Sequence, residues 1–500
     1  MLTRITNGYT LPQINEAFEQ SLPITRIETI SQGTIDLEKV KYVEAPSEEK
    51  VEQYKLRRGD VLFSHINSDK HLGKTAYFDV ADITLLHGIN LLLMRFTDAV
   101  SSKYAHYLFN HYRAAGEFIK IAQRAVNQSS INQRKLNQLA FPLPPLPEQR
   151  RIVAKLEELF SKLDAGVAAV RRTQALLKRY RQSVLHAAVT GELTRAWREA
   201  HPAPAETGAA LLRRIRAGRR AQWEAAQVAK RGGQLPLGDG WKSKYVEPEA
   251  VDTEGLPELP EGWVWASLPE LGELNRGKSK HRPRDDQRLY GDAYPFIQTG
   301  DVRHANGIIR SYTQSYSEFG LAQSRLWPAG TLCITIAANI ADTALLGFDA
   351  CFPDSVVGFI TPENHSNIKF VELFLRTAKE NIERYAPATA QKNINLEILS
   401  KVGVPVPSLE EQKQIVDEAE SRLTVLDALS QTLTDELKRA ERLRQSILHR
   451  AFTGRLVPQD ATDEPATALL TRLRETPAAP AKTKDGRGRK AVAQQTTLGL

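Results

Sequence analysis

The chain has 500 residues, of which 41% are hydrophobic and 25% charged, with a net charge of +8. This length suggests about three domains, and the composition excludes a wholly disordered chain. No apolar stretch is long enough for a transmembrane helix, and the first residues lack the apolar segment of a secretory signal. The two cysteines, Cys333 and Cys351, exclude a disulfide framework and a site with three or four thiolates. We therefore expect a cytoplasmic protein, although the charge alone is too mild to identify a polyanionic partner.

Residues 1–146 are predicted to form a mixed α/β domain. Apolar patterns predict strands at Ile24–Ile30, Asp60–His65 and Asn90–Phe96, and a helix at Ser102–Arg113. A polar segment follows the second strand, and a polar turn precedes a proline-rich run. Their side chains can hydrogen-bond to base edges or phosphates, with ordinary loops as the alternative. The candidates are Ser64, His65, Asn67, Lys70, His71, Lys74, Arg124, Asn127 and Gln128.

Residues 147–199 are predicted to form a long helix. Four prolines between Pro142 and Pro147 give an extended run, and Glu148 suits a helix N-terminus. Apolar residues then recur in steps of four and three, which is typical of a coiled-coil seam. Gly191 stands where a helix cap belongs. The candidate pairing or docking residues are Ile152, Leu156, Leu159, Leu163, Val170, Leu177 and Val184.

The remaining chain is predicted to contain a connector, a second domain, a second helix and a tail. Residues 200–258 form a linker with a short basic helix at Leu211–Lys230. Residues 259–409 form a second α/β domain, residues 410–460 a second helix, and residues 461–500 a disordered tail. Strands are expected at Tyr294–Thr299, Thr331–Ala337 and Ser355–Thr361, and a helix at Asn367–Arg384. The second seam holds Ile415, Leu426, Leu429, Leu433, Leu443 and Ile447.

The two long helices belong to an internal repeat with an offset of 263 residues. From Ile131 to Leu193, 24 of 63 positions are identical to their partners without a gap, including Glu148-Gln149 and Glu411-Gln412. The preceding domains are related more loosely. Because neither helix can bury a narrow seam alone, we expect the two to pair, with packing of each on its own domain as the alternative.

Gly272–Ser279 fits the phosphate-loop pattern G-x-x-x-x-G-K-[ST], which would suit a DNA-activated ATPase. However, Pro269 interrupts the preceding stretch, and the following residues have no apolar helix face. A better interpretation is a cation cluster for phosphate contacts, with a solvated charged loop as the alternative. The candidates are Arg276, Lys278, Lys280, Arg282 and Arg284, joined by the polar residues Asn339, Gln391 and Lys392.

Catalytic motifs are missing from the sequence. It has no Asn-Pro-Pro or Asp-Pro-Pro methyltransferase motif, no His-Glu-x-x-His and no Gly-x-Ser-x-Gly. We therefore expect a non-catalytic protein that binds no metal or cofactor itself. A coiled-coil scaffold without DNA specificity is the alternative to a DNA-binding protein.

The repeat resembles the DNA-specificity subunit of type I restriction–modification enzymes. The resemblance rests on Pro142–Gln149 with its helix, the copy at Pro405–Gln412, Leu259–Trp263 and the two Arg-Gln-Ser-(Val/Ile)-Leu-His endings. It implies an α+β fold with two α/β target-recognition domains, two long antiparallel coiled-coil helices as spacer, and a pseudo-two-fold repeat. Each domain would read half of a split site in double-stranded DNA.

The same resemblance implies partner proteins. The helices would dock two modification subunits, which bind S-adenosylmethionine and methylate adenine, and two restriction subunits can join them with ATP and magnesium. The sequence departs from the family in one place. The first domain lacks a counterpart of Pro260–Trp265, which leaves the packing of its first strand open.

Overall fold

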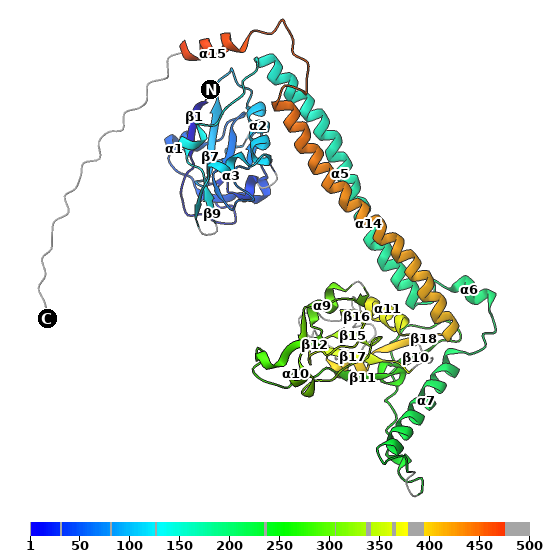
Figure 1. Cartoon of the computed structure of the whole chain (residues 1–500). Helices are drawn as coiled ribbons and strands as arrows, with labels where there is room; N and C mark the ends of the chain where they lie inside the picture. Colours follow the sequence, from blue (N-terminus) through cyan, green and yellow to red (C-terminus); the bar gives the residue numbers. More distant parts are fainter. Residues whose placement is uncertain are drawn as a thin grey trace, which may run out of the picture. The chain divides into compact units, whose positions relative to one another are not determined.

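The structure is a computed structural model that describes residues 2–30, 33–80, 83–125, 128–234, 238–305, 307–336, 342–362, 367–378 and 395–475. The chain divides into two compact units. Unit 1 comprises Met1–Val170 with Asp435–Leu500, and unit 2 comprises Arg171–Thr434. Figure 1 shows the elements along the chain in the colours of the sequence. Each unit contains one mixed α/β domain and a stretch of both long helices.

Unit 1 contains a four-stranded antiparallel sheet with the order β1-β7-β4-β6. These strands are β1 (Leu2–Asn7), β7 (Leu91–Phe96), β4 (Val61–Ser64) and β6 (Thr75–Tyr77). Two smaller sheets join β2 (Ser21–Ile24) to β3 (Lys41–Glu44), and β5 (Ile66–Asn67) to β9 (Gln128–Ser130) and β8 (Gln123–Ala125). The helices are α1 (Glu48–Tyr54), α2 (Ser102–Ala114), α3 (Glu117–Ile121), α4 (Gln133–Leu136) and α15 (Ala466–Glu475), with 3-10 turns at Glu28–Ile30 and Leu37–Lys39.

Both faces of the first sheet are covered, because successive strand residues point to opposite sides. Val61 and Phe63 of β4 pack with Phe109 of α2 and Phe118 of α3. Leu62 packs on the other side with a separate apolar cluster. This explains why β4 is apolar at consecutive positions rather than alternating.

Unit 2 repeats the same strand order. Its main sheet runs β11-β17-β15-β16-β13, in which the first four strands are antiparallel neighbours and β13 is parallel to β16. These strands are β11 (Glu273–Arg276), β17 (Val356–Ile360), β15 (Leu332–Thr335), β16 (Thr343–Leu346) and β13 (Ile308–Ile309). Strands β12 (Tyr290–Phe296) and β14 (Gln314–Tyr316) pair, as do β10 (Val264–Ser267) and β18 (Gly403–Val406). The loosely related halves of the sequence therefore share one architecture.

The helices of unit 2, apart from the long ones, belong to the connector region and to the α/β domain. Short helices are α6 (Arg195–Ala200), α8 (Leu268–Leu271), α9 (Thr299–His304), α10 (Glu318–Ala322) and α13 (Leu396–Ser400), with 3-10 turns at Lys242–Lys244 and Gln287–Leu289. The longer ones are α7 (Gly208–Ala229) and α11 (Ile368–Ala378). Helix α7 corresponds to the basic helix expected at Leu211–Lys230. Its Leu211 and Ile215 are fully buried in the same core as Val371 of α11.

The long helices are α5 (Leu146–Val189) and α14 (Leu409–Phe452), each of 44 residues. They run side by side and antiparallel within each unit (Figure 1). In unit 2 Arg181 of α5 forms an ion pair with Asp427 of α14, and in unit 1 Arg444 forms the repeated pair with Asp164. Apolar packing accompanies both pairs, since Ile152 and Leu156 meet Ile447 in unit 1 and Val184 meets Ile415 in unit 2. The structure therefore confirms that the two long helices pair with each other, rather than each packing only on its own domain.

The repeated Gln at the start of each long helix binds main-chain atoms of the α/β domain that precedes the helix. The side chain of Gln149 accepts a hydrogen bond from the amide of Ser101 at 2.8 Å and donates to the carbonyls of Ala99 and Pro144 at 3.2 and 2.9 Å. Gln412 likewise accepts from the amide of Asn367 at 2.9 Å and donates to Pro407 at 3.1 Å. The two glutamines therefore join each long helix to its α/β domain in the same way.

One strand prediction was wrong over nearly its whole length, and another was wrong at its end. The strand predicted at Ile24–Ile30 ends at Ile24, because the hydroxyl of Thr29 accepts the amide of Arg26 at 2.8 Å and closes a turn. The strand predicted at Tyr294–Thr299 ends at Phe296, because Asp301 accepts the amide of Gln298 at 2.8 Å and starts α9. Both are local side-chain bonds that compete with strand pairing.

Candidate nucleic-acid interface

In the first domain the small sheet β5-β9-β8 brings two predicted segments together. Asn67 of β5 lies opposite Ser129 of β9, and Arg124 of β8 lies opposite the same residue from the other side. Asp69 contacts both of the other strands of this sheet. Its carboxylate accepts a hydrogen bond from the hydroxyl of Ser129 in β9 and lies 3.7 Å from the guanidinium of Arg124 in β8. The segments that carry Asn67 and Arg124 thus meet at one polar surface.

Cations gather beside this sheet. Lys70 is exposed, and its carbonyl accepts a hydrogen bond of 2.9 Å from the guanidinium of Arg113, at the end of α2. Desolvation and the cations Lys74, Lys70 and Arg113 lower the pKa of His71. The His71 ring is therefore neutral near pH 7 and can donate or accept a hydrogen bond. Sequence reasoning missed Arg113 because only the folded chain brings the end of α2 beside Lys70.

Ser64 and His65 lie beneath the surface rather than on it. Ser64 is fully buried, and its hydroxyl accepts a hydrogen bond of 3.2 Å from the amide of Asn67. His65 is 8% exposed, and burial lowers its pKa. In this conformation both support the polar surface from below.

The second domain presents its cations after β11. Arg276, Lys278, Lys280, Arg282 and Arg284 are all exposed. Arg284 forms an ion pair with Asp354 at 3.2 Å. Within the described residues Arg276, Lys278 and Lys280 make no ion pair, so their charges face solvent. This surface suits contacts to phosphates.

The phosphate-loop alternative does not fit this geometry. Glu273–Arg276 is strand β11, paired with β17. The amides of Gly277 and Lys278, which a phosphate loop would offer to its ligand, donate to the carbonyls of Val356 and Phe352 at 2.8 and 3.1 Å. A strand and occupied amides leave no anion cradle, so the ATPase alternative is not favoured.

Four predicted residues lie outside the described residues, namely Asn127, Asn339, Gln391 and Lys392. Arg124 and Gln128 flank the first of these and are exposed. Among the described residues no cluster of side chains could hold a metal ion, and no helix is long and apolar enough to cross a membrane.

The predicted helix residues differ in exposure along α5 and α14. The most buried are Ile152, Leu156, Val184, Ile415, Leu426 and Ile447, all at most 9% exposed. Leu159, Leu163, Val170, Leu177 and Leu433 are half-buried. Leu429 and Leu443 are 46% and 49% exposed. Apolar side chains therefore remain uncovered on both units after the helices have paired.

Comparisons with known proteins agree with this architecture. The family model described as type I restriction modification DNA specificity domain matches residues 2–168 and 260–439. The chain is 28% identical over 460 residues to a protein named as the MjaX type I restriction enzyme specificity subunit of Methanocaldococcus jannaschii, covering 91% of this chain and 92% of that one. It is 25% identical over 366 residues to the EcoBI specificity subunit of Escherichia coli, covering 70% and 67%.

A solved structure gives the same fold. A chain from work on complex assembly and conformational transition of the type I R-M system matches with a TM-score of 0.61 and 18% identity, covering 91% of this chain and 98% of that chain. The two matched stretches coincide with the two α/β domains and the long helices that follow them. The chain therefore belongs to the type I restriction–modification DNA-specificity family and is a non-catalytic, DNA-recognising subunit.

Proposed function

We propose that this subunit reads a split site in double-stranded DNA, with one half bound by each α/β domain. The observation that carries the proposal is the shared strand order of two domains with different polar surfaces. One architecture with divergent surfaces suits two half-sites of different sequence. A scaffold without DNA specificity is not favoured, because the matching family model describes a DNA specificity domain. The segment boundaries predicted above, including 1–146 and 259–409, remain part of the proposal.

The two surfaces would bind DNA through different residues. In the first domain Asn67, Gln128 and neutral His71 offer donors and acceptors to base edges, while Lys70 and Arg124 contact phosphates. In the second domain the exposed cations from Arg276 to Arg284 contact phosphates. Asn127, Asn339, Gln391 and Lys392 stay candidates on sequence grounds.

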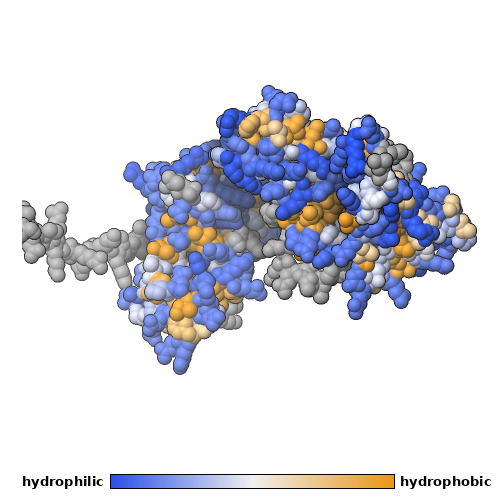
Figure 2. All heavy atoms as spheres, turned by 90° about the horizontal axis from the view of Figure 1, so that it is seen from below, coloured by the Kyte–Doolittle hydropathy of each residue, from blue (hydrophilic) through white to orange (hydrophobic). Residues whose placement is uncertain are grey.

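The long helices would dock the modification subunits. Exposed apolar side chains are where partner subunits gain affinity, and Leu176, Val425 and Leu429 are 55%, 59% and 46% exposed. The face in Figure 2 is largely hydrophilic and carries separate apolar patches. Repeated helices offer two equivalent surfaces, which suits two modification subunits that use S-adenosylmethionine. Two restriction subunits using ATP and magnesium complete the proposal, and we expect the complex to act on cytoplasmic DNA.

Methylome sequencing of a host with this chain and its modification subunit tests the proposal. The expected result is a split adenine-methylated motif that disappears without the chain. Exchange of residues 259–407 for those of another member of the family should change only one half of that motif. Absence of a split motif, or a change in both halves after the exchange, contradicts two independent half-site readers.

A further inference from the structure

Helix α10 is bound to the segment that carries the cations of the second domain. We call residues 277–288 the cationic loop. The side chain of Gln323, directly after α10, accepts a hydrogen bond of 3.0 Å from the amide of His281. The hydroxyl of Ser324 donates to the carbonyl of Lys278 at 2.8 Å. These two bonds hold the C-terminal end of α10 against the cationic loop.

The aromatic side chain of Phe319 in α10 lies at this contact and is 43% exposed. Its ring centroid lies 5.2 Å from that of His281, and the guanidinium of Arg288 lies over the ring at 5.0 Å from the centroid. A guanidinium in this position is attracted by the negative face of the ring. A single exposed apolar side chain is common on protein surfaces, but both neighbours of this ring belong to the cationic loop.

The backbone of α10 determines which of its side chains reach the surface. Gly320 is buried, and a Cβ at this position would lie 2.3 Å from the carbonyl oxygen of Leu289 and 2.7 Å from the ring of Tyr316. The helix therefore packs too closely on this side to admit a side chain. At its start the hydroxyl of Ser317 accepts a hydrogen bond of 3.2 Å from the amide of Gly320 and caps the helix. With Gly320 facing inward, the neighbouring Phe319 is held at the surface.

The charges around this ring suit a polyanionic partner. Lys278 and Lys280 are exposed, and within the described part of unit 2 they form no ion pair. The nearby carboxylate of Asp286 is paired with Arg288 at 2.7 Å. Nucleic-acid-binding proteins combine cations for the phosphates with apolar or aromatic side chains for the bases. Phe319 and the cationic loop offer both kinds of contact.

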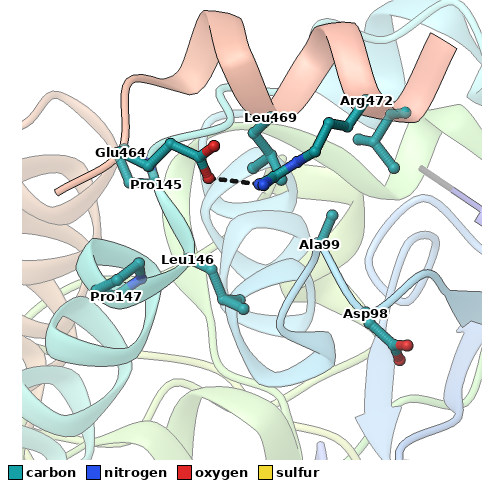
Figure 3. A pocket seen from close by; sticks show the side chains of 9 residues that line it. Asp98, Ala99, Pro145, Leu146, Pro147, Glu464, Leu469 and Arg472 are labelled. Carbon is teal, nitrogen blue, oxygen red and sulfur yellow. Dashed lines mark hydrogen bonds and ion pairs between the residues drawn. The ribbon is translucent and has the colours of Figure 1, made fainter. Parts of the chain in front are cut away.

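The hollow below α15 in unit 1 has the opposite balance of charge. Figure 3 shows the apolar side chains of Leu146 and Leu469 in this hollow, and the ion pair between Glu464 and Arg472. The lining also includes Asp98, so carboxylates outnumber cations there. Phosphates would be repelled from this hollow, whereas the cationic loop attracts them.

We propose that Phe319 is a base-contacting residue of the second domain, and that its ring packs against the C5-methyl group of a thymine. This inference rests on the proposed half-site reading and names the side chain that recognises one base of that half-site. The thymine methyl is the apolar feature that a base pair presents in the major groove, and phenylalanine is among the side chains that contact it. Stacking between two bases would need both faces of the ring, and Arg288 covers one of them. Lys278 and Lys280 contact the flanking phosphates.

Duplexes in which one thymine of the half-site is replaced by deoxyuridine test the proposal, because the replacement removes only the methyl group. Methylome sequencing identifies the half-site, and methylation of an adenine in each half places a thymine opposite that adenine. With the chain assembled on its modification subunits, fluorescence anisotropy should show about fourfold weaker binding after replacement at one thymine. Phe319→Ala should bind the unaltered duplex about tenfold more weakly and should no longer distinguish thymine from deoxyuridine.

Two further variants separate the contact from a general effect on the protein. Phe319→Leu keeps an apolar side chain and should retain most of the preference for thymine. The matched control is Phe18→Ala in the first domain, which removes an aromatic side chain of similar exposure, 40%, and should leave the fourfold preference unchanged. The melting temperature of Phe319→Ala should equal that of the unaltered chain, because the ring is largely at the surface.

Equal binding of thymine and deoxyuridine duplexes by the unaltered chain, at every thymine of that half-site, would overturn the proposal. A preference for thymine that persists in Phe319→Ala would also overturn it, since another group would then contact the methyl. In both cases the split methylated motif itself remains. Absence of any split motif would instead contradict the half-site reading, so the two failures are distinguishable.

Discussion

Neutralising Lys278 and Lys280 should weaken DNA binding in a way that depends on salt. Both side chains are exposed and form no ion pair within the described residues, while their amides hold the loop through Phe352 and Gln323. The double change Lys278→Ala and Lys280→Ala therefore removes two charges without releasing the backbone. The control is Lys155→Ala with Lys162→Ala, which removes the same charge from two lysines paired with Glu158 at 2.8 and 2.6 Å.

The magnitude follows from release of counterions. Each phosphate neutralised by a cation contributes about −0.9 to the slope of log affinity against log salt. Two lost contacts should make the slope about 1.8 units less negative. Affinity should then fall about 60-fold at 0.1 M salt and about 20-fold at 0.2 M.

Fluorescence anisotropy of a labelled duplex, with the chain assembled on its modification subunits, measures this slope. The control variant should keep the slope of the unaltered chain. An unchanged slope for Lys278→Ala with Lys280→Ala, or an equal change in the control, would show that this loop is only a solvated charged surface.

Three further variants probe the fold and the helices. Trp263→Phe should lower the free energy of unfolding by about 1.5–3 kcal/mol more than Trp327→Phe, because the indole of Trp327 has no hydrogen-bond partner among the described residues. Equal losses in urea unfolding would argue against the hydrogen bond from the indole of Trp263 to Glu411. Burial lowers the pKa of His106 to about 4, so its contribution to stability should be constant above pH 6.5 and fall by about 3 kcal/mol towards pH 4, and His106→Gln should remove that part of the acid loss in thermal unfolding. Leu429→Lys should weaken capture of the modification subunit with an unchanged melting temperature, unlike the neighbouring exposed Thr432→Lys, which should leave capture unchanged.

Much of the fold could be predicted, because the apolar periods and the repeated capping residues can each be read from a short stretch of sequence. The steps of four and three indicated two long helices, and these begin at Leu146 and Leu409 but end at Val189 and Phe452, short of the predicted segments 147–199 and 410–460. The repeated Asn132 and Asn395 are helix caps, whose side chains accept the amides of Lys135 and Ile398 at 2.9 and 2.8 Å. Short-range patterns of this kind need no knowledge of the rest of the chain.

The candidate site was less predictable, because it depends on contacts between distant segments. Nothing in residues 64–74 indicates that β5 pairs with β9 about 60 residues later. Burial of Ser64 and His65 likewise follows from the folded sheet, since the same polar pattern would suit an exposed loop. The phosphate-loop pattern failed for the same reason, as pairing with β17 makes Glu273–Arg276 a strand.

Because Gln149 and Gln412 contact the domains through backbone atoms, the α/β domains are interchangeable in principle. Within the part of the chain that the structure describes, both side chains bind only backbone amides and carbonyls, which every residue other than proline provides. A recognition domain with other side chains at Ala99, Ser101 or Asn367 can therefore be joined to the same helix without a compensating change. A change of target sequence then requires only a new domain that presents its backbone at the start of that helix.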